Sequence, residues 1–206
     1  MSRMKIYIIR HGETDWNTIK RLQGRSDIEL NDQGRRLAEI TADALKEVKF
    51  SRIYTSPLKR AKETALIIKQ DREIPVIEEP RIIEMSFGIY EGLCSGKEHY
   101  TIPDPNFSFF FTKPEQYIPP KGAESIEELC ERTTDFLQEL VNCQDLQEDT
   151  VLISTHGAAL MGLLSSVHNR GIAGFWGEGV HKNCAVTILE STKDGISILE
   201  EGKIFY

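Results

Sequence analysis

The sequence predicts an α/β fold, a three-layer α/β/α sandwich with a mostly parallel central sheet and a small cap insertion. Short runs of β-branched apolar residues alternate along the chain with segments whose apolar residues recur at helical spacing. One long segment, residues 79–122, follows neither pattern and holds six of the eight prolines. Alternation of this kind places helices on both faces of a sheet, and the irregular segment is expected to form an insertion or cap.

The predicted strands are short and apolar. The first, KIYIIR, ends abruptly in the polar sequence HGETDWN, as a buried strand does when it delivers a loop to the surface. Five further runs have the same character, so the predicted strands are residues 5–10, 52–55, 75–78, 150–154, 184–189 and 196–199.

Four helices are predicted from apolar periodicity and from capping residues. Asn31 caps the first, and Ser56 with Pro57 supplies an N-cap and a first-turn proline for the second. Ser125 and Glu128 form a capping box in front of the third. The fourth follows His156 and is apolar nearly all round, which is typical of a buried helix. The expected helices are residues 32–48, 58–70, 126–141 and 157–169.

Length and composition favour one domain. The chain has 206 residues, of which 40% are hydrophobic and 28% are charged, and no stretch reads as a linker. We therefore expect a single domain over residues 1–206, with a variable cap insertion at about residues 93–121. The sequence carries no information on oligomeric state.

Charge and hydropathy exclude several classes of partner. A formal charge of −7 argues against binding to nucleic acid or to an anionic membrane, because such partners select basic surfaces. No stretch approaches the roughly 20 apolar residues of a membrane span, and the N-terminus does not resemble a signal peptide. The four cysteines form no CxxC pair, which favours reduced structural thiols. The expected location is the cytoplasm.

Two predicted strands end in the same dipeptide, His11-Gly12 and His156-Gly157. The carboxyl ends of parallel strands meet at one edge of a sheet, so both imidazoles should lie there. A lone histidine at a strand end is usually structural, but two at one edge indicate a site. Each glycine permits close approach of the backbone to a ligand, and we expect Gly157 to lie against the substrate. The helix that follows His156 would offer free N–H groups to an anion.

Two arginines belong to the same region of the predicted fold. Arg10 directly precedes His11, and Arg60 lies in the first turns of the second helix. Guanidinium groups match phosphate oxygens in a bidentate manner, so two arginines and two histidines that converge describe a phosphate pocket. Arg60 alone would be unremarkable, since its neighbourhood LKRAKE reads equally well as a solvated helix face.

Five motifs in order resemble the histidine phosphatase superfamily, in its phosphoglycerate-mutase-like branch. The resemblance covers the chain from about residue 5 to 92 and again from about 125 to 189, and residues 93–121 match none of its motifs. The five motifs are RHGETDWN, GRSDIELNDQG, YTSPLKRAKETA, IIEMSFGIYEG and STHG.

The resemblance implies a role for each matching residue. His11 would be the nucleophile that becomes phosphohistidine, and Glu84 would be the proton donor. Gln23 and Gly24 fall where the family places a loop over the substrate. The remaining residues that it implies bind the phosphate, and they are Arg10, Asn17, Arg60 and His156.

The proposed chemistry needs these residue types. Negative charge spreads over the equatorial oxygens in phosphoryl transfer, and converging cationic donors stabilise it with no metal ion and no cofactor. Histidine attacks only when neutral, and a backbone carbonyl that accepts from its other N–H would hold the required tautomer. The alkoxide leaving group needs a proton, which a carboxylic acid can supply.

Several residues have competing interpretations. Glu91 is a rival to Glu84 as the acid, although the motif favours Glu84. His99 and His168 are expected to be structural or exposed, while His181 precedes a strand near the site and is a candidate for substrate contact. The remaining alternatives concern packing: Asp15 and Trp16 are expected to cap and pack the first loop, and Phe107, Phe109, Phe110 and Phe111 form either a small core or a substrate lid.

The same core serves two reactions, which differ in whether water or a second hydroxyl takes the phosphate from histidine. The family's mutases hold a carboxylated substrate with arginines and lysines in the insertion. Here the insertion contains only Lys97, Lys113 and Lys121. We therefore rank a phosphatase acting on small phosphomonoesters first, a cofactor-dependent phosphoglycerate mutase second, and a non-catalytic phospho-ligand binding module third.

Overall fold

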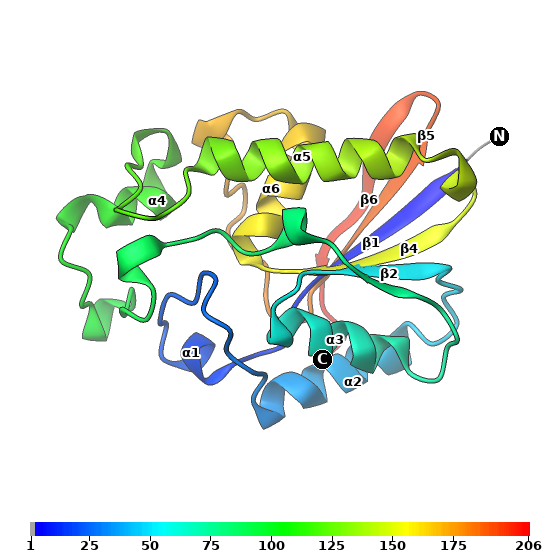
Figure 1. Cartoon of the computed structure of the whole chain (residues 1–206), viewed down its shortest axis with the longest axis horizontal. Coiled ribbons are helices and arrows are strands. Elements are labelled where there is room, and N and C mark those ends of the chain that lie inside the picture. The colour runs from blue at the N-terminus through cyan, green and yellow to red at the C-terminus, as the bar shows by residue number, and fades with distance from the viewer. Residues whose placement is uncertain (1–2) are drawn as a thin grey trace.

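The computed structural model describes residues 3–206 as a six-stranded sheet between two layers of helices (Figure 1). The strand order is β3-β2-β4-β1-β5-β6, in which the first four strands are parallel to one another, β5 is antiparallel to β1, and β6 is antiparallel to β5. The predicted three-layer, mostly parallel fold is therefore confirmed. The strands are β1 (Met4–Arg10), β2 (Arg52–Thr55), β3 (Val76–Glu78), β4 (Thr150–Thr155), β5 (Val186–Thr192) and β6 (Gly195–Lys203).

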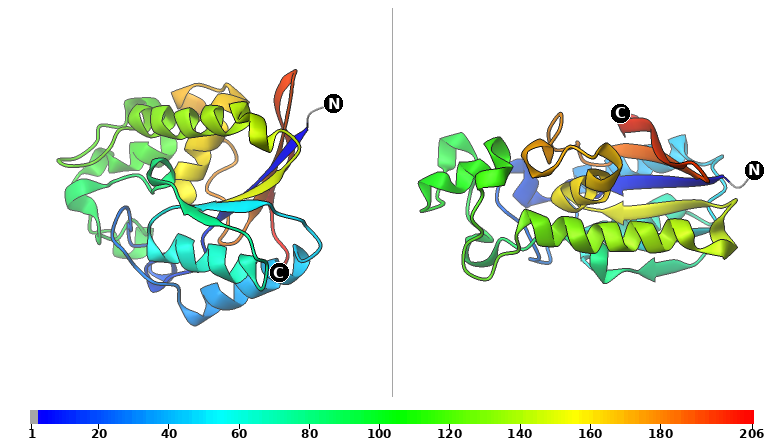
Figure 2. Two further views of the ribbon diagram at one scale, coloured as in Figure 1. Left: turned by 45° about the vertical axis from the view of Figure 1, so that its right-hand side comes forward. Right: turned by 90° about the horizontal axis from the view of Figure 1, so that it is seen from above.

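The helices divide between the two faces of the sheet. Figure 2 shows α5 and α6 on one face and α2 and α3 on the other. Two one-turn helices, α1 and α4, lie outside these layers, toward the end of the molecule at which β1 and β4 finish (Figure 1). The bounds are α1 (Asp15–Thr18), α2 (Asp32–Ala44), α3 (Lys59–Lys69), α4 (Phe109–Thr112), α5 (Ile126–Asn142) and α6 (Gly157–His168).

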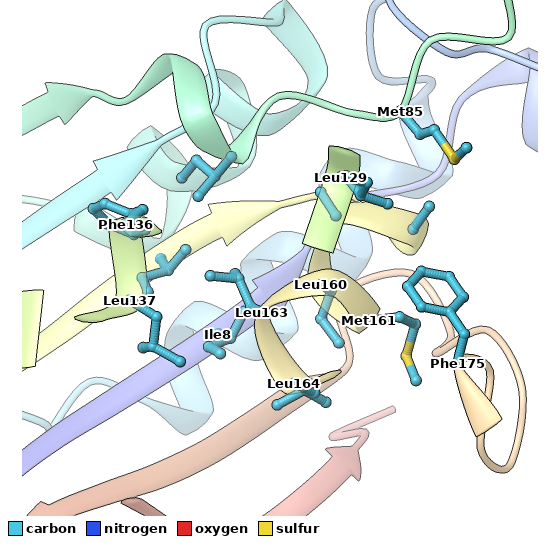
Figure 3. Close-up of a cluster of buried hydrophobic side chains, with 14 of the residues drawn as sticks. Ile8, Met85, Leu129, Phe136, Leu137, Leu160, Met161, Leu163, Leu164 and Phe175 are labelled. Carbon is cyan, nitrogen blue, oxygen red and sulfur yellow. The ribbon is translucent and has the colours of Figure 1, made fainter. Parts of the chain in front are cut away.

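Alternate residues of β1 enter different cores. Ile8 belongs to the cluster that contains Leu129 of α5 and Leu163 of α6 (Figure 3). Its neighbour Ile9 belongs to the cluster on the other face, together with Leu37 of α2. A strand buried on both sides reads as a continuous apolar run, which explains why KIYIIR shows no polar alternation.

Most predicted elements are confirmed, with corrections at their ends. The helix predicted at residues 58–70 is α3, which begins at Lys59. Its N-cap is Leu58 rather than Ser56, whose hydroxyl instead accepts from the Leu58 N–H at 3.3 Å. The helix predicted at residues 32–48 is α2, which ends at Ala44, four residues before the predicted end, because the chain turns back there toward β2. The capping box of Ser125 and the start of α5 are confirmed.

The loop after His11 contains a helix that was not predicted. The helix α1 is capped by Thr14, not by Asp15, and Asn17 completes a capping box with Thr14. One turn is too short to show apolar periodicity, so no pattern in the sequence could reveal it. The C-terminal strands are also shifted and longer than predicted, since β5 begins at Val186 and β6 extends to Lys203.

Residues 93–121, which we call the cap segment, consist of the helix α4 and three short 3₁₀ turns. Phe107 and Phe110 are each 1% exposed and pack with Phe87, outside the cap segment, at ring distances of 6.1 and 5.2 Å. The indole N–H of Trp176 donates to the Phe110 carbonyl. Aromatic packing therefore ties the cap segment to the body. Within residues 3–206, no helix has both the length and the apolar character needed to cross a bilayer.

The first turn of α2 lies directly against the loop that follows β1. A Cβ atom on Gly34 would lie 2.1 Å from the Glu13 carbonyl oxygen, and one on Gly12 would lie 2.6 Å from the Gly34 carbonyl oxygen. Both distances are far inside van der Waals contact with backbone atoms. The two glycines therefore permit the close approach of α2 to the loop.

We expect Gly34→Ala to lower the free energy of unfolding by about 1–3 kcal/mol, because backbone must shift to admit the methyl group. In an uncrowded helix the same change would stabilise the protein by up to about 1 kcal/mol. Urea unfolding measures the difference. The control is Gln33→Ala, an exposed neighbour in the same turn. Equal stability of the two variants would contradict the close-packing explanation.

Candidate active site

Two parallel strands bring the two histidines together. The strand β1 pairs with β4 so that Arg10 lies opposite Thr155, and His11 and His156 follow directly. Their ring centroids are 5.2 Å apart, and both side chains are almost fully buried. The structure therefore places the two imidazoles at one edge of the sheet.

The protonation state of His11 is fixed by its surroundings. Its Nδ1 lies 2.6 Å from the Gly12 carbonyl oxygen, which can only accept a hydrogen bond. The proton must therefore sit on Nδ1, and Nε2 keeps a lone pair. Burial, together with repulsion from the charges of Arg60 and Arg10, holds the pKa of His11 well below 6.5. The imidazole is neutral at neutral pH.

His156 is neutral for the same reason. Burial is the largest cause that lowers its pKa well below 6.5, followed by the charges of Arg60 and other neighbours. Its Nε2 lies 2.7 Å from the Ser56 hydroxyl oxygen. Ser56, predicted as a helix cap, is thus a contact of the second histidine.

Arg10 and Arg60 each leave a buried donor unused. Arg10 donates through Nη1 to the backbone carbonyl of His181, and Arg60 donates to the carbonyls of Gly24 and Ser26, both at 2.7 Å. In the described part of the chain, the buried Nε of each arginine has no hydrogen-bond partner. Burial lowers the pKa of Arg60 to about 10, so the group stays cationic at neutral pH. Unpaired buried cationic donors are costly, and an anion would satisfy them.

Glu84 is anchored by backbone N–H groups. Its Oε1 accepts from Met85 at 2.9 Å and from Ala159 at 3.0 Å, while its Oε2 accepts from Ala158 at 3.2 Å. The expectation that the first turn of α6 offers free N–H groups to an anion is therefore wrong for Ala158 and Ala159. A carboxylate of the protein itself occupies them.

Glu91 accepts hydrogen bonds from a different set of backbone groups than Glu84 does. Its carboxylate accepts from the Arg25 and Ser26 N–H groups, both at 3.0 Å, and from the Phe87 N–H at 3.2 Å. These bonds fix the loop at Gly24, whose φ of +51° is in the left-handed region that favours glycine. The structure separates the two rival carboxylates, because Glu84 lines the pocket and Glu91 holds the loop beside it.

The candidate residues surround one pocket of about 460 Å³. His156 lies behind its wall, in contact distance of His11, rather than on its surface. The Oδ1 atom of Asn17 accepts from the Thr14 N–H at 3.1 Å, and the Gln23 amide oxygen accepts from the Thr14 hydroxyl at 3.0 Å. Eight of the nine predicted site residues line the pocket: Arg10, His11, Asn17, Gln23, Gly24, Arg60, Glu84 and Gly157.

Only one of the two motif glycines faces the pocket. A Cβ atom on Gly157 would lie 3.7 Å from Arg10 Nε and 3.8 Å from Glu84 Oε2, so this glycine keeps space open beside them. Gly12 faces the backbone of Gly34 instead. The prediction that Gly12 permits approach of a ligand is therefore wrong, and its small size serves the packing of α2.

Asn183 contributes to the site although no motif pointed to it. Its side-chain amide donates to the His11 carbonyl oxygen at 2.9 Å, and its own carbonyl accepts from the Tyr206 hydroxyl at 2.6 Å. A single asparagine before a strand carries no distinguishing signal in one sequence. The His181 side chain points elsewhere, toward Glu201 at 3.4 Å, and only its backbone carbonyl, bonded to Arg10, serves the site.

The phenylalanine cluster forms a small core and also borders the pocket. Phe107 is a core residue of the cap segment. Phe110 and Phe111 line the pocket together with Trp176, and Phe111 is 42% exposed. The cap segment therefore forms an aromatic wall of the pocket as well as a small core.

Comparison with known proteins agrees with this arrangement. The Bacillus subtilis protein named uncharacterized phosphatase PhoE is 36% identical over 162 residues, which cover 79% of this chain and 76% of that protein. A probable phosphoglycerate mutase, GpmB of Proteus mirabilis, is 35% identical over 165 residues, 80% of this chain and 74% of that protein. Relatives of this chain thus carry both phosphatase and mutase names.

The fold also matches a solved structure closely. The structure of Bacillus stearothermophilus YhfR superposes with a TM-score of 0.90 at 31% identity and covers 98% of both chains. The model of the histidine phosphatase superfamily, branch 1, matches residues 6–203, nearly the whole sequence. This chain therefore belongs to branch 1 of the histidine phosphatase superfamily.

Proposed function

We propose that this chain is a phosphatase that hydrolyses small phosphomonoesters through a phosphohistidine intermediate on His11. The observation that carries the proposal is the hydrogen bond from His11 Nδ1 to the Gly12 carbonyl. It leaves Nε2 with a lone pair in a pocket where Arg10 and Arg60 present unpaired buried donors. A neutral nucleophile beside fixed cationic groups is what metal-free phosphoryl transfer needs.

The first step transfers the phosphoryl group to the protein. Nε2 of His11 attacks phosphorus while the bond from phosphorus to the alcohol oxygen breaks, and Glu84 gives its proton to that oxygen. Arg10, Arg60 and Asn17 would hold the equatorial oxygens, where the negative charge spreads. The carbonyl of Gly12 stabilises the ring as it becomes charged on phosphorylation.

The second step returns the protein to its starting state. Glu84, now a carboxylate, takes a proton from water, and the water oxygen attacks phosphorus as the bond to Nε2 breaks. Inorganic phosphate leaves, and His11 is neutral again with its proton on Nδ1. Among residues 3–206, the Oε2 atom of Glu84 accepts one hydrogen bond, from Ala158 at 3.2 Å, whereas Oε1 accepts two, so Oε2 is the oxygen suited to carry the transferred proton.

A phosphoglycerate mutase is the second candidate. The three lysines of the cap segment, Lys97, Lys113 and Lys121, do not line the pocket. The wall that the cap segment provides is instead aromatic, through Phe110 and Phe111. The cap segment therefore contributes no lysine or arginine to the pocket, in contrast to the insertion of the family's mutases, and we place the phosphatase first.

A direct assay separates the candidate functions. Purified protein is incubated with 3-phosphoglycerate, with and without bisphosphoglycerate, and with a panel of phosphomonoesters. Release of inorganic phosphate from the panel supports a phosphatase, whereas interconversion of phosphoglycerates that depends on bisphosphoglycerate supports a mutase. Binding without either reaction would identify a non-catalytic phospho-ligand module and overturn the proposal.

The neutral state of His11 predicts a pH dependence of stability. Its pKa is lowered in the folded chain, so below about pH 6.5 the unfolded chain binds a proton that the folded chain does not. The free energy of unfolding should therefore fall as pH decreases below 6.5, by at most about 1.4 kcal/mol per pH unit from this residue.

Urea unfolding of His11→Gln between pH 7.5 and pH 5.5 should show a shallower decline in stability than the wild type. His99→Gln, at an exposed position of the cap segment, is the matched control and should keep the wild-type decline. If His11→Gln leaves the pH dependence unchanged, His11 is not held neutral by burial.

Replacement of His11 by alanine should abolish turnover, because no covalent intermediate can form. Incubation of the wild type with a labelled phosphomonoester, followed by an acid-free quench, should reveal acid-labile phosphate on the protein. That label should be absent from His11→Ala. Turnover near the wild-type rate in the variant would refute the mechanism.

Replacement of Glu84 by glutamine should slow alkyl phosphates by about 10²–10⁴-fold, the range of general acid catalysis. Nitrophenyl phosphate, whose leaving group needs no proton, should lose much less in the burst of the first turnover. Glu91→Gln is the comparison, and we expect it to affect both substrates alike because Glu91 holds the loop at Arg25 and Ser26. Leaving-group dependence in Glu91→Gln alone would move the acid to Glu91.

A further inference from the structure

The proposed mechanism assigns no role to two cationic residues that line the pocket. Lys20 and Arg21 line the same pocket as His11, although neither belongs to the phosphate-binding set. Glu84 is the one acidic residue among the described lining residues, against four lysines and arginines. This excess of positive charge lies in a chain whose formal net charge is −7. A local reversal of charge in a pocket concentrates anions there.

Lys20 is held in place by the cap segment. Its backbone has a φ of +54°, a conformation that is unfavourable for lysine. The N–H and the hydroxyl of Ser95 both donate to the Lys20 carbonyl, at 2.9 and 3.0 Å, and hold this conformation. Strain of this kind persists only where neighbouring contacts impose it, and it often marks a functional position.

The lysine stem also has a fitted surface. A Cβ atom on Gly96 would lie 3.2 Å from both Cβ and Cδ of Lys20, so the absence of a side chain at residue 96 leaves room for the stem. Packing of the stem reduces the rotamer entropy that the ammonium group loses when it binds a ligand. Lys20 is therefore partly preorganised although it is exposed.

Arg21 is oriented by a different contact. Its guanidinium lies over the Trp16 ring, 5.3 Å from the centroid, and its backbone bridges to Cys94 of the cap segment. Within residues 3–206, neither Lys20 nor Arg21 forms an ion pair with an acidic side chain. Both charges are available to a ligand.

We propose that Lys20 and Arg21 form a second anion subsite, which selects phosphomonoesters whose alcohol part carries its own carboxylate or phosphate. The inference rests on the proposed function for the phosphoryl end of the substrate. There, Arg10 at the end of β1 and Arg60 supply the charge. Lys20 and Ser95 lie where the cap segment meets the loop after α1, so they face the remainder of the substrate.

The aromatic wall suggests the opposing possibility. Phe110, Phe111 and Trp176 could favour a neutral apolar leaving group, and such a pocket would show no preference for a second charge. The two possibilities differ in one measurable quantity, the affinity difference between ligands that are alike except for the second charge.

Binding to the His11→Ala protein measures this difference without turnover. Calorimetry compares 3-phosphoglycerate with glycerol 3-phosphate, which carries a hydroxymethyl group in place of the carboxylate. A bisphosphate of propanediol tests a second phosphate, and phenyl phosphate tests the apolar alternative. We expect the two ligands that carry a second anionic group to bind more tightly than glycerol 3-phosphate by about three- to tenfold. This difference in affinity should shrink as salt is raised.

Two variants assign the preference to Lys20. Lys20→Met keeps the apolar stem and removes the charge, so the preference for the second anion should be lost while glycerol 3-phosphate binds within about twofold of the parent. Gly96→Ala should reduce the preference too, by displacing the stem. Lys97→Met, an exposed lysine of the cap segment outside this pocket, is the matched control and should change nothing.

Competition against phenyl phosphate turnover by the wild type gives the same ratios independently. Equal affinities with and without the second anion, or a preference that survives Lys20→Met, would overturn the subsite. Tighter binding of phenyl phosphate than of either ligand with a second anionic group would favour the aromatic wall and would also overturn the subsite. Failure of the wild type to hydrolyse any of these esters would refute the phosphatase, while the binding ratios would still decide the subsite.

Discussion

The burial of Arg60 and of the Arg10 Nε atom beside two imidazoles is the constraint on which the rest of the site depends. Arg60 is fully buried, and charge in such a place must be compensated by oriented polar groups. The carbonyls of Gly24 and Ser26 supply part of that compensation, and an anion would supply the remainder. The same charges, added to burial, keep His11 neutral. In the proposed mechanism, binding of a phosphate and preparation of the nucleophile thus have one electrostatic cause.

The sheet provides the geometry that this electrostatic arrangement requires. The strands β1 and β4 pair in parallel with Arg10 opposite Thr155, so one register positions both histidines. A slip of one residue would turn each side chain to the other face of the sheet. Tyr7 packs against the cluster that contains Ile9, and Ile8 belongs to the opposite cluster, so such a slip would carry the Tyr7 ring into the wrong core. The apolar packing of the two layers therefore fixes the relative positions of two polar groups.

The sequence predicted what depends on periodicity and on motifs, and it failed where tertiary contacts decide. The sheet, the main helices and eight of the residues that line the pocket followed from patterns and motifs visible along the chain, whereas other lining residues such as Lys20 and Arg21 did not. The occupation of the first turn of α6 by Glu84 did not, because it joins residues more than 70 positions apart. The same holds for Asn183, whose bond to the His11 carbonyl spans 172 positions, and for Gly12, whose neighbour Gly34 becomes apparent only when α2 is placed.

The two rival carboxylates are bound to different segments around the pocket. Glu84 is tied to the backbone at the start of α6, on the rigid body of the fold. Glu91 instead holds the loop at Arg25 and Ser26, which Arg60 also contacts. The preceding residues of this loop pair with the start of the cap segment, since the Leu22 N–H donates to the Leu93 carbonyl at 2.9 Å. In the proposed enzyme, chemistry therefore belongs to the sheet edge, and substrate selection belongs to the loop and cap segment. A change in the cap can alter the substrate without disturbing His11.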